Sequence, residues 1–153
     1  MVFRPTISRL LISAIALTAL ALWRADAPAA ADAARPLEPH AIRVIDGDTF
    51  DAARVRYRIV NIDTPETGDR ARCAAERRLG DRATHAARTL IRNAADIEIR
   101  PTGRIDSYGR TIAFLSLDGR DFGEILVERG LARPWRGRRE PWCDARGRLI
   151  NAG

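Results

Sequence analysis

Apolar and polar residues alternate with a period of two in several short segments, which is the pattern of half-buried β-strands. The clearest case runs from Arg54 to Ile62, where apolar residues at 55, 57 and 59 alternate with arginines. Thr64-Pro65 ends this strand, because proline donates no hydrogen bond and restricts the residue before it. Further strands are predicted at 41–45, 49–52, 96–100 and 110–117.

Two of these strands, 41–45 and 49–52, are expected to form a hairpin. Asp46-Gly47 lies between them, and a glycine in such a turn supplies a positive φ angle. The strand at 110–117 has apolar residues on both of its faces, so we expect it to be largely buried.

The apolar period changes to three and four between Ala71 and Ile91. This predicts an amphipathic helix of about twenty residues, with arginines on the outer face and a slight weakening at Gly80. Asp121 and Glu124 form a capping box that predicts a second, short helix. From about residue 134 we predict an irregular, arginine-rich tail.

The order of these elements predicts the fold class. Five strands, with one helix before the fourth and another after the fifth, indicate an α+β protein, mainly β, built on a small Greek-key barrel. A chain of 153 residues of which 46% are hydrophobic has room for one such domain and an N-terminal segment.

The N-terminal segment has the pattern of a secretory signal peptide. Arg4 and Arg9 precede an apolar run from Leu10 to Trp23, and small residues follow up to Ala31. We expect cleavage after Ala31, an Ala/Pro linker over 32–40 and a folded domain over 41–153, exported to the periplasm or secreted. The alternative is an uncleaved membrane anchor that holds the same domain outside the cytoplasm, although the run is short for a span of about 20 residues.

The charge of the chain favours a polyanionic partner. The net charge is +6 and all 26 basic residues are arginine, whose planar guanidinium matches phosphate. A GC-rich genome explains the missing lysine equally well, but it does not remove the positive charge.

The two cysteines, Cys73 and Cys143, suggest one disulfide in an exported chain, and two buried free thiols are the alternative. No Cys-x-x-Cys pair or Cys/His cluster occurs, so a zinc site has no support.

Three separated segments carry the candidate chemistry: 45–50, 63–66 and 106–110. Taken singly, they read as a hairpin turn, a capped helix start and a Tyr-Gly turn. Together they offer carboxylates for a hard cation and two arginines, Arg58 and Arg110, for a phosphate. This combination suits the cleavage of phosphodiester bonds.

The three motifs are Ile-Asp-Gly-Asp-Thr-Phe, an arginine five residues before Asp-Thr-Pro-Glu, and Asp-Ser-Tyr-Gly-Arg. In this order, over about 42–133, the chain resembles the staphylococcal nuclease-like (thermonuclease) family. The segments 72–76 and 142–143 are similar to its short exported bacterial members, which favours the disulfide. The resemblance implies an OB-type five-stranded barrel and a calcium-dependent, sugar-nonspecific nuclease that hydrolyses DNA and RNA to 3′-phosphate products.

The resemblance also implies roles for individual residues. The calcium ligands would be the carboxylates of Asp48 and Asp63 and the backbone carbonyl of Thr64. The catalytic residues would be Glu66 as general base and Arg58 and Arg110 as the phosphate clamp. Tyr108 would lie beside the bound nucleotide and Tyr57 near the base.

One geometric condition follows from the strand itself. Arg58 and Asp63 are five residues apart, so strict alternation would place them on opposite faces. They can meet only if the strand has a bulge or ends near Ile62.

The expected substrates are DNA and RNA, preferably single-stranded, and we expect a monomer without a protein partner. One alternative is an OB-fold module that binds nucleic acid without cleaving it. Another is a membrane-anchored accessory nuclease that serves a DNA-processing machine.

Overall fold

The computed structural model describes residues 35–36 and 39–150, all of which belong to the unit Asp32–Gly153. The predicted signal peptide or anchor lies outside the described residues, as does most of the predicted linker. Within the described part of the chain, no helix is both long and apolar enough to cross a membrane.

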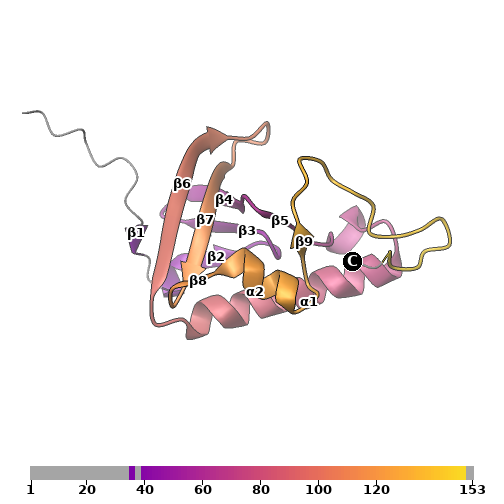
Figure 1. Ribbon diagram of the computed structural model, residues 1–153, viewed down its shortest axis with the longest axis horizontal. Coiled ribbons are helices and arrows are strands. Elements are labelled where there is room, and N and C mark those ends of the chain that lie inside the picture. Colours follow the sequence, from indigo (N-terminus) through magenta and orange to yellow (C-terminus); the bar gives the residue numbers. More distant parts are fainter. Residues whose placement is uncertain (1–34, 37–38, 151–153) are drawn as a thin grey trace, which may run out of the picture. The chain divides into compact units, whose positions relative to one another are not determined.

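A single curled sheet forms the body of the domain (Figure 1). Its strands follow the order β1-β6-β7-β4-β3-β2, and β8 pairs with β7. All neighbours are antiparallel except β4 and β7, which are parallel. The strands are β1 (Arg35–Pro36), β2 (Ile42–Val44), β3 (Thr49–Ala52), β4 (Val55–Ile59), β6 (Ile97–Ile105), β7 (Thr111–Leu117) and β8 (Arg120–Asp121).

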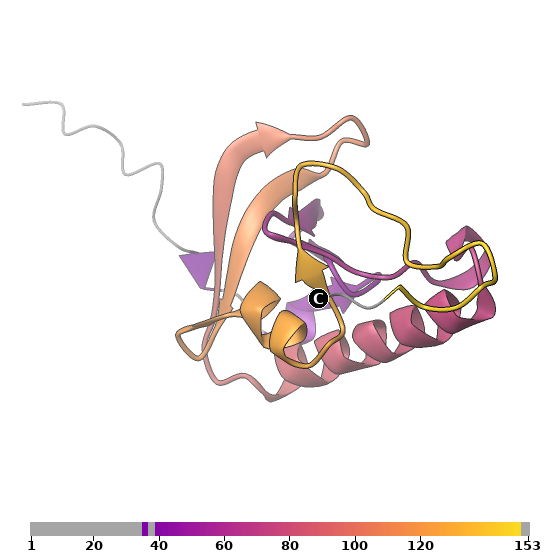
Figure 2. The ribbon, with the colours of Figure 1, turned by 45° about the vertical axis from the view of Figure 1, so that its right-hand side comes forward.

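The remaining elements lie against or beside this sheet. Helix α1 (Ala74–Asn93) runs along one end of the curled sheet, and α2 (Phe122–Glu128) follows β8 (Figure 2). A second, two-stranded sheet joins β5 (Ile62–Asp63) to β9 (Arg133–Pro134). Two short 3-10 helices, η1 (Pro39–Ala41) and η2 (Gly68–Arg70), complete the list. The predicted OB-type α+β fold, mainly β, is confirmed.

The core forms between α1 and the concave face of the sheet. Helix α1 buries Ala83 and Ile91, as its apolar period predicted, and also Ala87. Strand β7 contributes alternate residues, Ala113 and Leu115 among them, while the residues between them are only half-buried. Strand β7 therefore has no exposed residue, in line with the expectation that it is largely buried, but only one of its faces is fully buried.

Strand β6 is longer than the predicted 96–100 and continues to Ile105. Its pairing with β7 changes register between Pro101 and Ile105, and Gly103 adopts φ +78° there. A bulge lets a strand pass a proline that would otherwise interrupt the ladder.

The β2–β3 hairpin and the cap of α2 are confirmed, but the reason for Gly47 is different from the one expected. Gly47 does not have a positive φ. A Cβ atom at this position would lie 2.8 Å from Thr64 Cγ2 and 3.0 Å from Ala83 Cβ. The turn therefore needs glycine because it packs tightly against Thr64.

At the start of α2, the Asp121 carboxylate accepts a hydrogen bond from Glu124 N at 2.9 Å, which is the predicted cap.

The β3–β4 turn contains two strained residues, since Ala53 has φ +48° and Arg54 has φ +66°. Non-glycine residues in this region cost about 1–2 kcal/mol each, and such two-residue turns favour Asn-Gly. The double variant Ala53→Asn/Arg54→Gly should raise the free energy of unfolding by about 1–2 kcal/mol, as measured by urea denaturation. An unchanged or lower value would mean that the turn is not strained in solution.

Candidate active site

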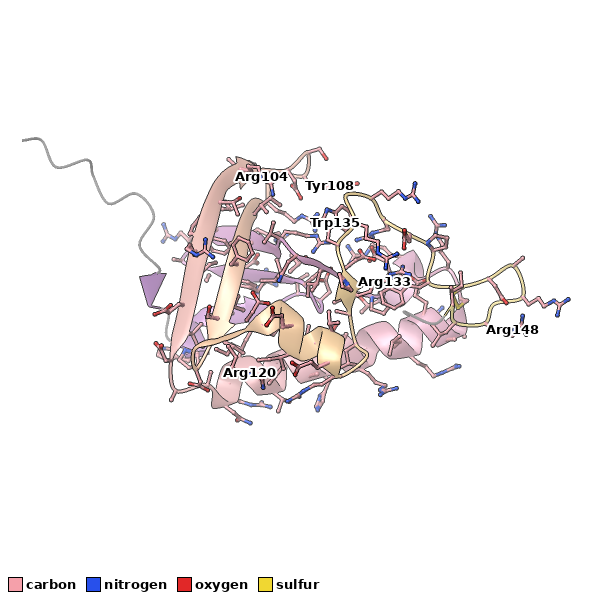
Figure 3. The ribbon with its side chains drawn as sticks, viewed as in Figure 1. Arg104, Tyr108, Arg120, Arg133, Trp135 and Arg148 are labelled. Carbon is pink, nitrogen blue, oxygen red and sulfur yellow. A yellow bond between two sulfur atoms is a disulfide. The ribbon has the colours of Figure 1, made fainter. Side chains whose placement is uncertain are left out.

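The three predicted segments meet in one open cleft of about 800 Å³. Its walls come from the β2–β3 turn, β4, the segment after β5, the β6–β7 turn and the C-terminal tail (residues 134–150). The residues that line it include Asp46, Asp48, Arg58, Thr64, Glu66, Arg70, Tyr108, Arg110, Trp135 and Arg139. Figure 3 labels Tyr108 and Trp135 on the two loops that project at this end of the domain.

A bend between β4 and β5 brings Arg58 and Asp63 to the same side of the chain, although they are five residues apart. Strand β4 ends at Ile59, the chain bends at residues 60–61, and β5 begins at Ile62. Arg58 Nη1 donates to the carbonyl oxygens of Ile59 and Ile62, at 2.9 and 3.0 Å, and so spans the bend. As a result Arg58 Nη2 lies 3.7 Å from Asp63 Oδ1.

Asp48 is buried and fully engaged. Its Oδ2 accepts hydrogen bonds from the backbone N–H and the hydroxyl of Thr64, both at 3.0 Å, and lies 3.2 Å from Arg58 Nη1. Its own N–H donates to Asp46 Oδ1 at 3.2 Å. Burial, and then the neighbouring charge of Asp48, raise the pKa of Asp46 above its usual value. By accepting the hydrogen bond from Asp48 N, the Asp46 carboxylate stabilises the β2–β3 turn.

Asp63 is a buried carboxylate, with only 2% of its surface exposed. Its Oδ2 accepts a hydrogen bond from the indole N–H of Trp142 at 3.1 Å. Its Oδ1 is buried and accepts no hydrogen bond from the described residues. Burial above all, and also the charge of Asp48, raise the pKa of Asp63, although nearby arginines and Trp142 oppose the shift. Such a carboxylate favours a cation beside it.

The donors in this part of the cleft suit a hard cation. Asp48, Asp63 and the carbonyl of Thr64 offer oxygen ligands, which calcium prefers. Asp63 Oδ1 lies near two guanidinium groups but accepts no hydrogen bond from the described residues, which fits that use. Among the described residues, no three His, Cys, Asp or Glu side chains come together as a metal cage. A cation here would therefore need the carbonyl, water or a substrate oxygen to complete its coordination.

Glu66 lies at the edge of the cleft, held between two arginines. Its Oε2 is 3.2 Å from Arg70 Nε, and its Oε1 forms an ion pair with Arg139 Nη1. Its backbone N–H donates to the buried carboxylate of Glu76 at 3.3 Å. The side chain keeps 16% exposure, so it can reach a molecule bound in the cleft.

The β6–β7 turn holds Arg110 in place. Arg110 Nε donates to Asp106 Oδ2 at 2.7 Å, and Nη1 donates to the Thr49 hydroxyl at 3.3 Å. Burial would raise the pKa of Asp106, but hydrogen bonds from Arg110 and Tyr108 outweigh it and lower the pKa. Tyr108 is 83% exposed, with its ring 5.3 Å from the Arg110 guanidinium. An exposed ring and a fixed guanidinium therefore stand together at the cleft.

Tyr57 is not part of the cleft. Its ring is 3% exposed and stacks on Phe50 in the core, with 5.3 Å between ring centroids. The expectation that Tyr57 lies near a bound base is corrected, because no ligand could reach a ring packed inside the barrel.

Sequence reasoning missed the part played by the tail. Its conformation is mostly irregular, as predicted, but Trp135 and Arg139 line the cleft and Trp142 binds Asp63. Two tryptophans in a short arginine-rich segment were the available signal. Without periodicity they could not be assigned to a partner.

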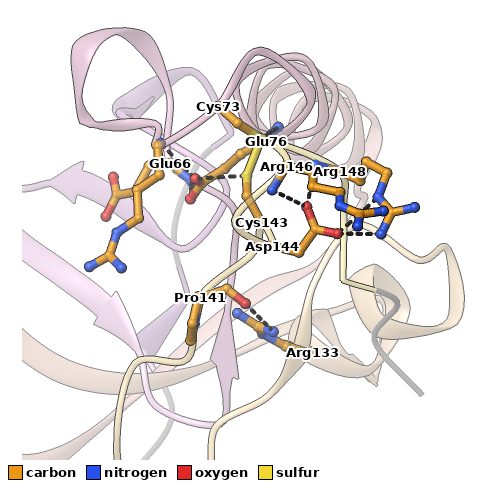
Figure 4. The surroundings of a disulfide bond; sticks show 10 residues. Glu66, Cys73, Glu76, Arg133, Pro141, Cys143, Asp144, Arg146 and Arg148 are labelled. Atoms are coloured by element: carbon orange, nitrogen blue, oxygen red, sulfur yellow. Dashed lines mark hydrogen bonds and ion pairs between the residues drawn. A yellow bond between two sulfur atoms is a disulfide. The ribbon is translucent and has the colours of Figure 1, made fainter.

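The predicted disulfide is present and fixes the tail to the start of α1. Cys73 and Cys143 are bonded across 70 residues, and the Glu76 carboxylate lies 3.7 Å from the Cys143 sulfur (Figure 4). Glu76 Oε2 accepts a hydrogen bond from Arg72 N at 2.7 Å, and its other oxygen accepts from Glu66 N. Glu76 therefore contacts the disulfide through one carboxylate oxygen and the backbone of Glu66 through the other.

Comparison with known proteins agrees with this architecture. The family described as "Staphylococcal nuclease homologue" matches residues 56–150, which is more than half of the chain. The chain therefore belongs to this family.

Three relatives show similar levels of identity. Endonuclease YncB of Bacillus subtilis (strain 168) is 32% identical over 96 residues, which is 60% of this chain and 44% of that protein. The SPbeta prophage-derived endonuclease YokF of the same organism is 34% identical over 98 residues, 60% of this chain and 32% of that protein. The thermonuclease of Staphylococcus hyicus is 33% identical over 96 residues, 60% and 56% of the two chains. The matched region thus spans a third to just over half of these curated relatives.

Gly80 gives a prediction whose sign is decisive. A Cβ atom here would lie 2.4 Å from the carbonyl oxygen of Glu66 and 2.7 Å from that of Pro65. Helix propensity alone predicts that Gly80→Ala stabilises by about 1 kcal/mol. The close contact with a rigid backbone instead predicts a lower free energy of unfolding, measured by urea denaturation. A stabilised variant would show that α1 does not pack on this loop as described.

The disulfide is expected to stabilise the fold. Closing a loop with a sequence separation of 70 should stabilise the fold by about 4 kcal/mol on the chain-entropy model. The variant Cys73→Ser/Cys143→Ser should melt at a lower temperature, and chemical reduction of the wild type should give the same melting temperature. No difference between oxidised and reduced wild type would argue that the bond carries no stability.

Proposed function

We propose that this protein is a calcium-dependent nuclease that hydrolyses DNA and RNA to 3′-phosphate products without strong preference for the sugar. The observation that carries the proposal is the meeting of Asp48, Glu66, Arg58 and Arg110 in one cleft, with Asp63 directly behind Arg58. The names of the three relatives, two endonucleases and one thermonuclease, support the same reaction class.

Calcium would be held by the carboxylates of Asp48 and Asp63 and by the carbonyl of Thr64. The burial of Asp63, whose Oδ1 accepts no hydrogen bond from the described residues, supports a cation at this point. When bound, the ion would polarise a phosphoryl oxygen and help to orient the attacking water. The incomplete protein ligand set leaves room for both.

The groups of the protein supply the rest of the chemistry. Glu66, partly exposed at the cleft, would accept the proton of the attacking water. The new bond forms between this water oxygen and phosphorus, and the bond from phosphorus to the 5′ oxygen breaks. The 5′ oxygen leaves as a hydroxyl after taking up a proton, and the phosphate stays on the 3′ side.

Arg58 and Arg110 would stabilise the charge that grows on the phosphate during this reaction. Both guanidinium groups are fixed in advance, Arg58 by the carbonyls of the bend and Arg110 by Asp106. Donors that are already oriented need little reorganisation when the charge develops, which is the condition for strong electrostatic catalysis.

The exposed ring of Tyr108 offers a stacking surface that tolerates any base. It is accessible to unpaired bases, which supports a preference for single-stranded substrates.

We further propose that the protein acts as a monomer after export to the periplasm or medium. The disulfide supports an oxidising compartment, and the N-terminal pattern supports export.

The test uses the oxidised protein, heat-denatured DNA and calcium, and follows the release of 3′-phosphate ends. Glu66→Gln should lower kcat by about 10²–10⁴-fold and keep the circular dichroism spectrum of the wild type. Glu124→Gln, at an exposed position of α2, is the matched control and should keep full activity. A chelator should stop the reaction.

Two results would contradict the proposal. Activity that survives in Glu66→Gln would remove this residue from the mechanism. Binding of nucleic acid without cleavage, under any divalent ion, would favour the alternative of a non-catalytic OB-fold binding module.

A further inference from the structure

Arg139 belongs to the irregular tail, yet its side chain lies in the cleft, which the sequence did not predict. It lines the same cleft as Arg58 and Arg110 and keeps 45% exposure of its side chain. Its Nε lies 3.4 Å from Asp63 Oδ1, and its Nη1 forms an ion pair with Glu66 Oε1. One guanidinium thus contacts both the proposed base and a proposed cation ligand.

The surrounding tail is built so that this contact is fixed. Before Arg139, β9 pairs with β5, and Trp135 N donates to Asn61 O at 2.8 Å. After Arg139, Trp142 is hydrogen-bonded to Asp63 and its neighbour Cys143 is in the disulfide. Both ends of this loop are therefore anchored to the site.

Two arginines that precede Arg139 in the tail make other contacts and no ion pair with Glu66, although Arg133 also lies 3.7 Å from Asp63 Oδ2. Arg133 packs over the Trp142 ring at 3.8 Å and donates to the carbonyl oxygen of Glu140. It also donates to the carbonyl oxygen of Pro141 (Figure 4). Arg138 is 81% exposed and has only a 3.8 Å contact with Glu140. Arg139 is thus the tail arginine that the anchored loop brings to Glu66.

The electrostatics of the cleft indicate what this arginine does. The contacts of Arg139 neutralise two carboxylates that the proposed reaction needs for other purposes. A divalent cation at Asp63 would compete with Arg139, because both bind the same oxygen atoms. A guanidinium released from these carboxylates would remain tethered beside the phosphate site, where its planar donors match phosphate oxygens.

We infer that Arg139 is a third phosphate-binding arginine, held by Asp63 and Glu66 until cation and substrate enter the cleft. This inference rests on the proposed nuclease function and adds a residue to it. Two consequences follow. Removing Arg139 should make the cation bind more tightly, and it should make the protein a poorer catalyst.

The experiment compares Arg139→Ala, the conservative Arg139→Lys and the matched control Arg138→Ala in the full, oxidised protein. Calcium affinity is measured by titration calorimetry without nucleic acid. The kcat/KM value is measured with single-stranded DNA at saturating calcium. Melting temperatures show whether each variant is folded, and Arg139→Gln replaces the alanine variant if that one is not.

Arg139→Ala should bind calcium about tenfold more tightly, because one competing positive charge is gone. Its kcat/KM should fall about 10- to 100-fold. Arg139→Lys should lie between the alanine variant and the wild type, because it keeps the charge and loses the planar fork. Arg138→Ala should match the wild type in both measurements.

The inference is overturned if Arg139→Ala equals Arg138→Ala in either calcium affinity or kcat/KM while the wild type is active. If the wild type and Arg138→Ala also fail to cleave, the proposed function itself is contradicted and the phosphate-binding role is lost with it. The two failures are therefore distinguishable within one set of proteins.

Discussion

The structure depends on how a buried arginine is paired. The Arg58 side chain is only 8% exposed, and it lies between Asp48 and Asp63, at 3.2 and 3.7 Å, with two backbone carbonyls as further acceptors. Buried charges are tolerated only when each has partners. The bend after β4, the close packing of Gly47 on Thr64 and the indole of Trp142 can all be understood as ways to supply these partners.

The negative charge of the cleft exceeds what Arg58 alone can balance. Asp48 and Glu66 line one cleft and Asp63 lies behind Arg58, and Arg139 comes from the tail to contact Asp63 and Glu66. The tail holds this position because the disulfide and Trp142 anchor it. Arg58, Arg70, Arg133 and Arg139 all lie within ion-pair distance of these three carboxylates. A cation bound at the proposed site would therefore replace arginine contacts that now neutralise the carboxylates, which connects the stability of the fold with the proposed chemistry.

Local patterns in the sequence predicted the local elements well. The period of α1, the Asp121 cap and the hairpin whose turn contains Asp48 follow from nearest neighbours along the chain. What required the three-dimensional structure was close approach: the burial of Arg58, the need for glycine at 47 and 80, and the core position of Tyr57. The role of the tail was also beyond reach, because an irregular segment has no period from which its partners can be deduced.

The central claim is that the buried carboxylates form a cation site, and a crystal structure of the oxidised protein with calcium tests it most directly. We expect an anomalous peak within coordination distance of Asp48, Asp63 and the Thr64 carbonyl, with the Arg139 guanidinium moved away from Asp63. A peak elsewhere, or no peak at saturating calcium with Arg139 still on Asp63, would contradict it.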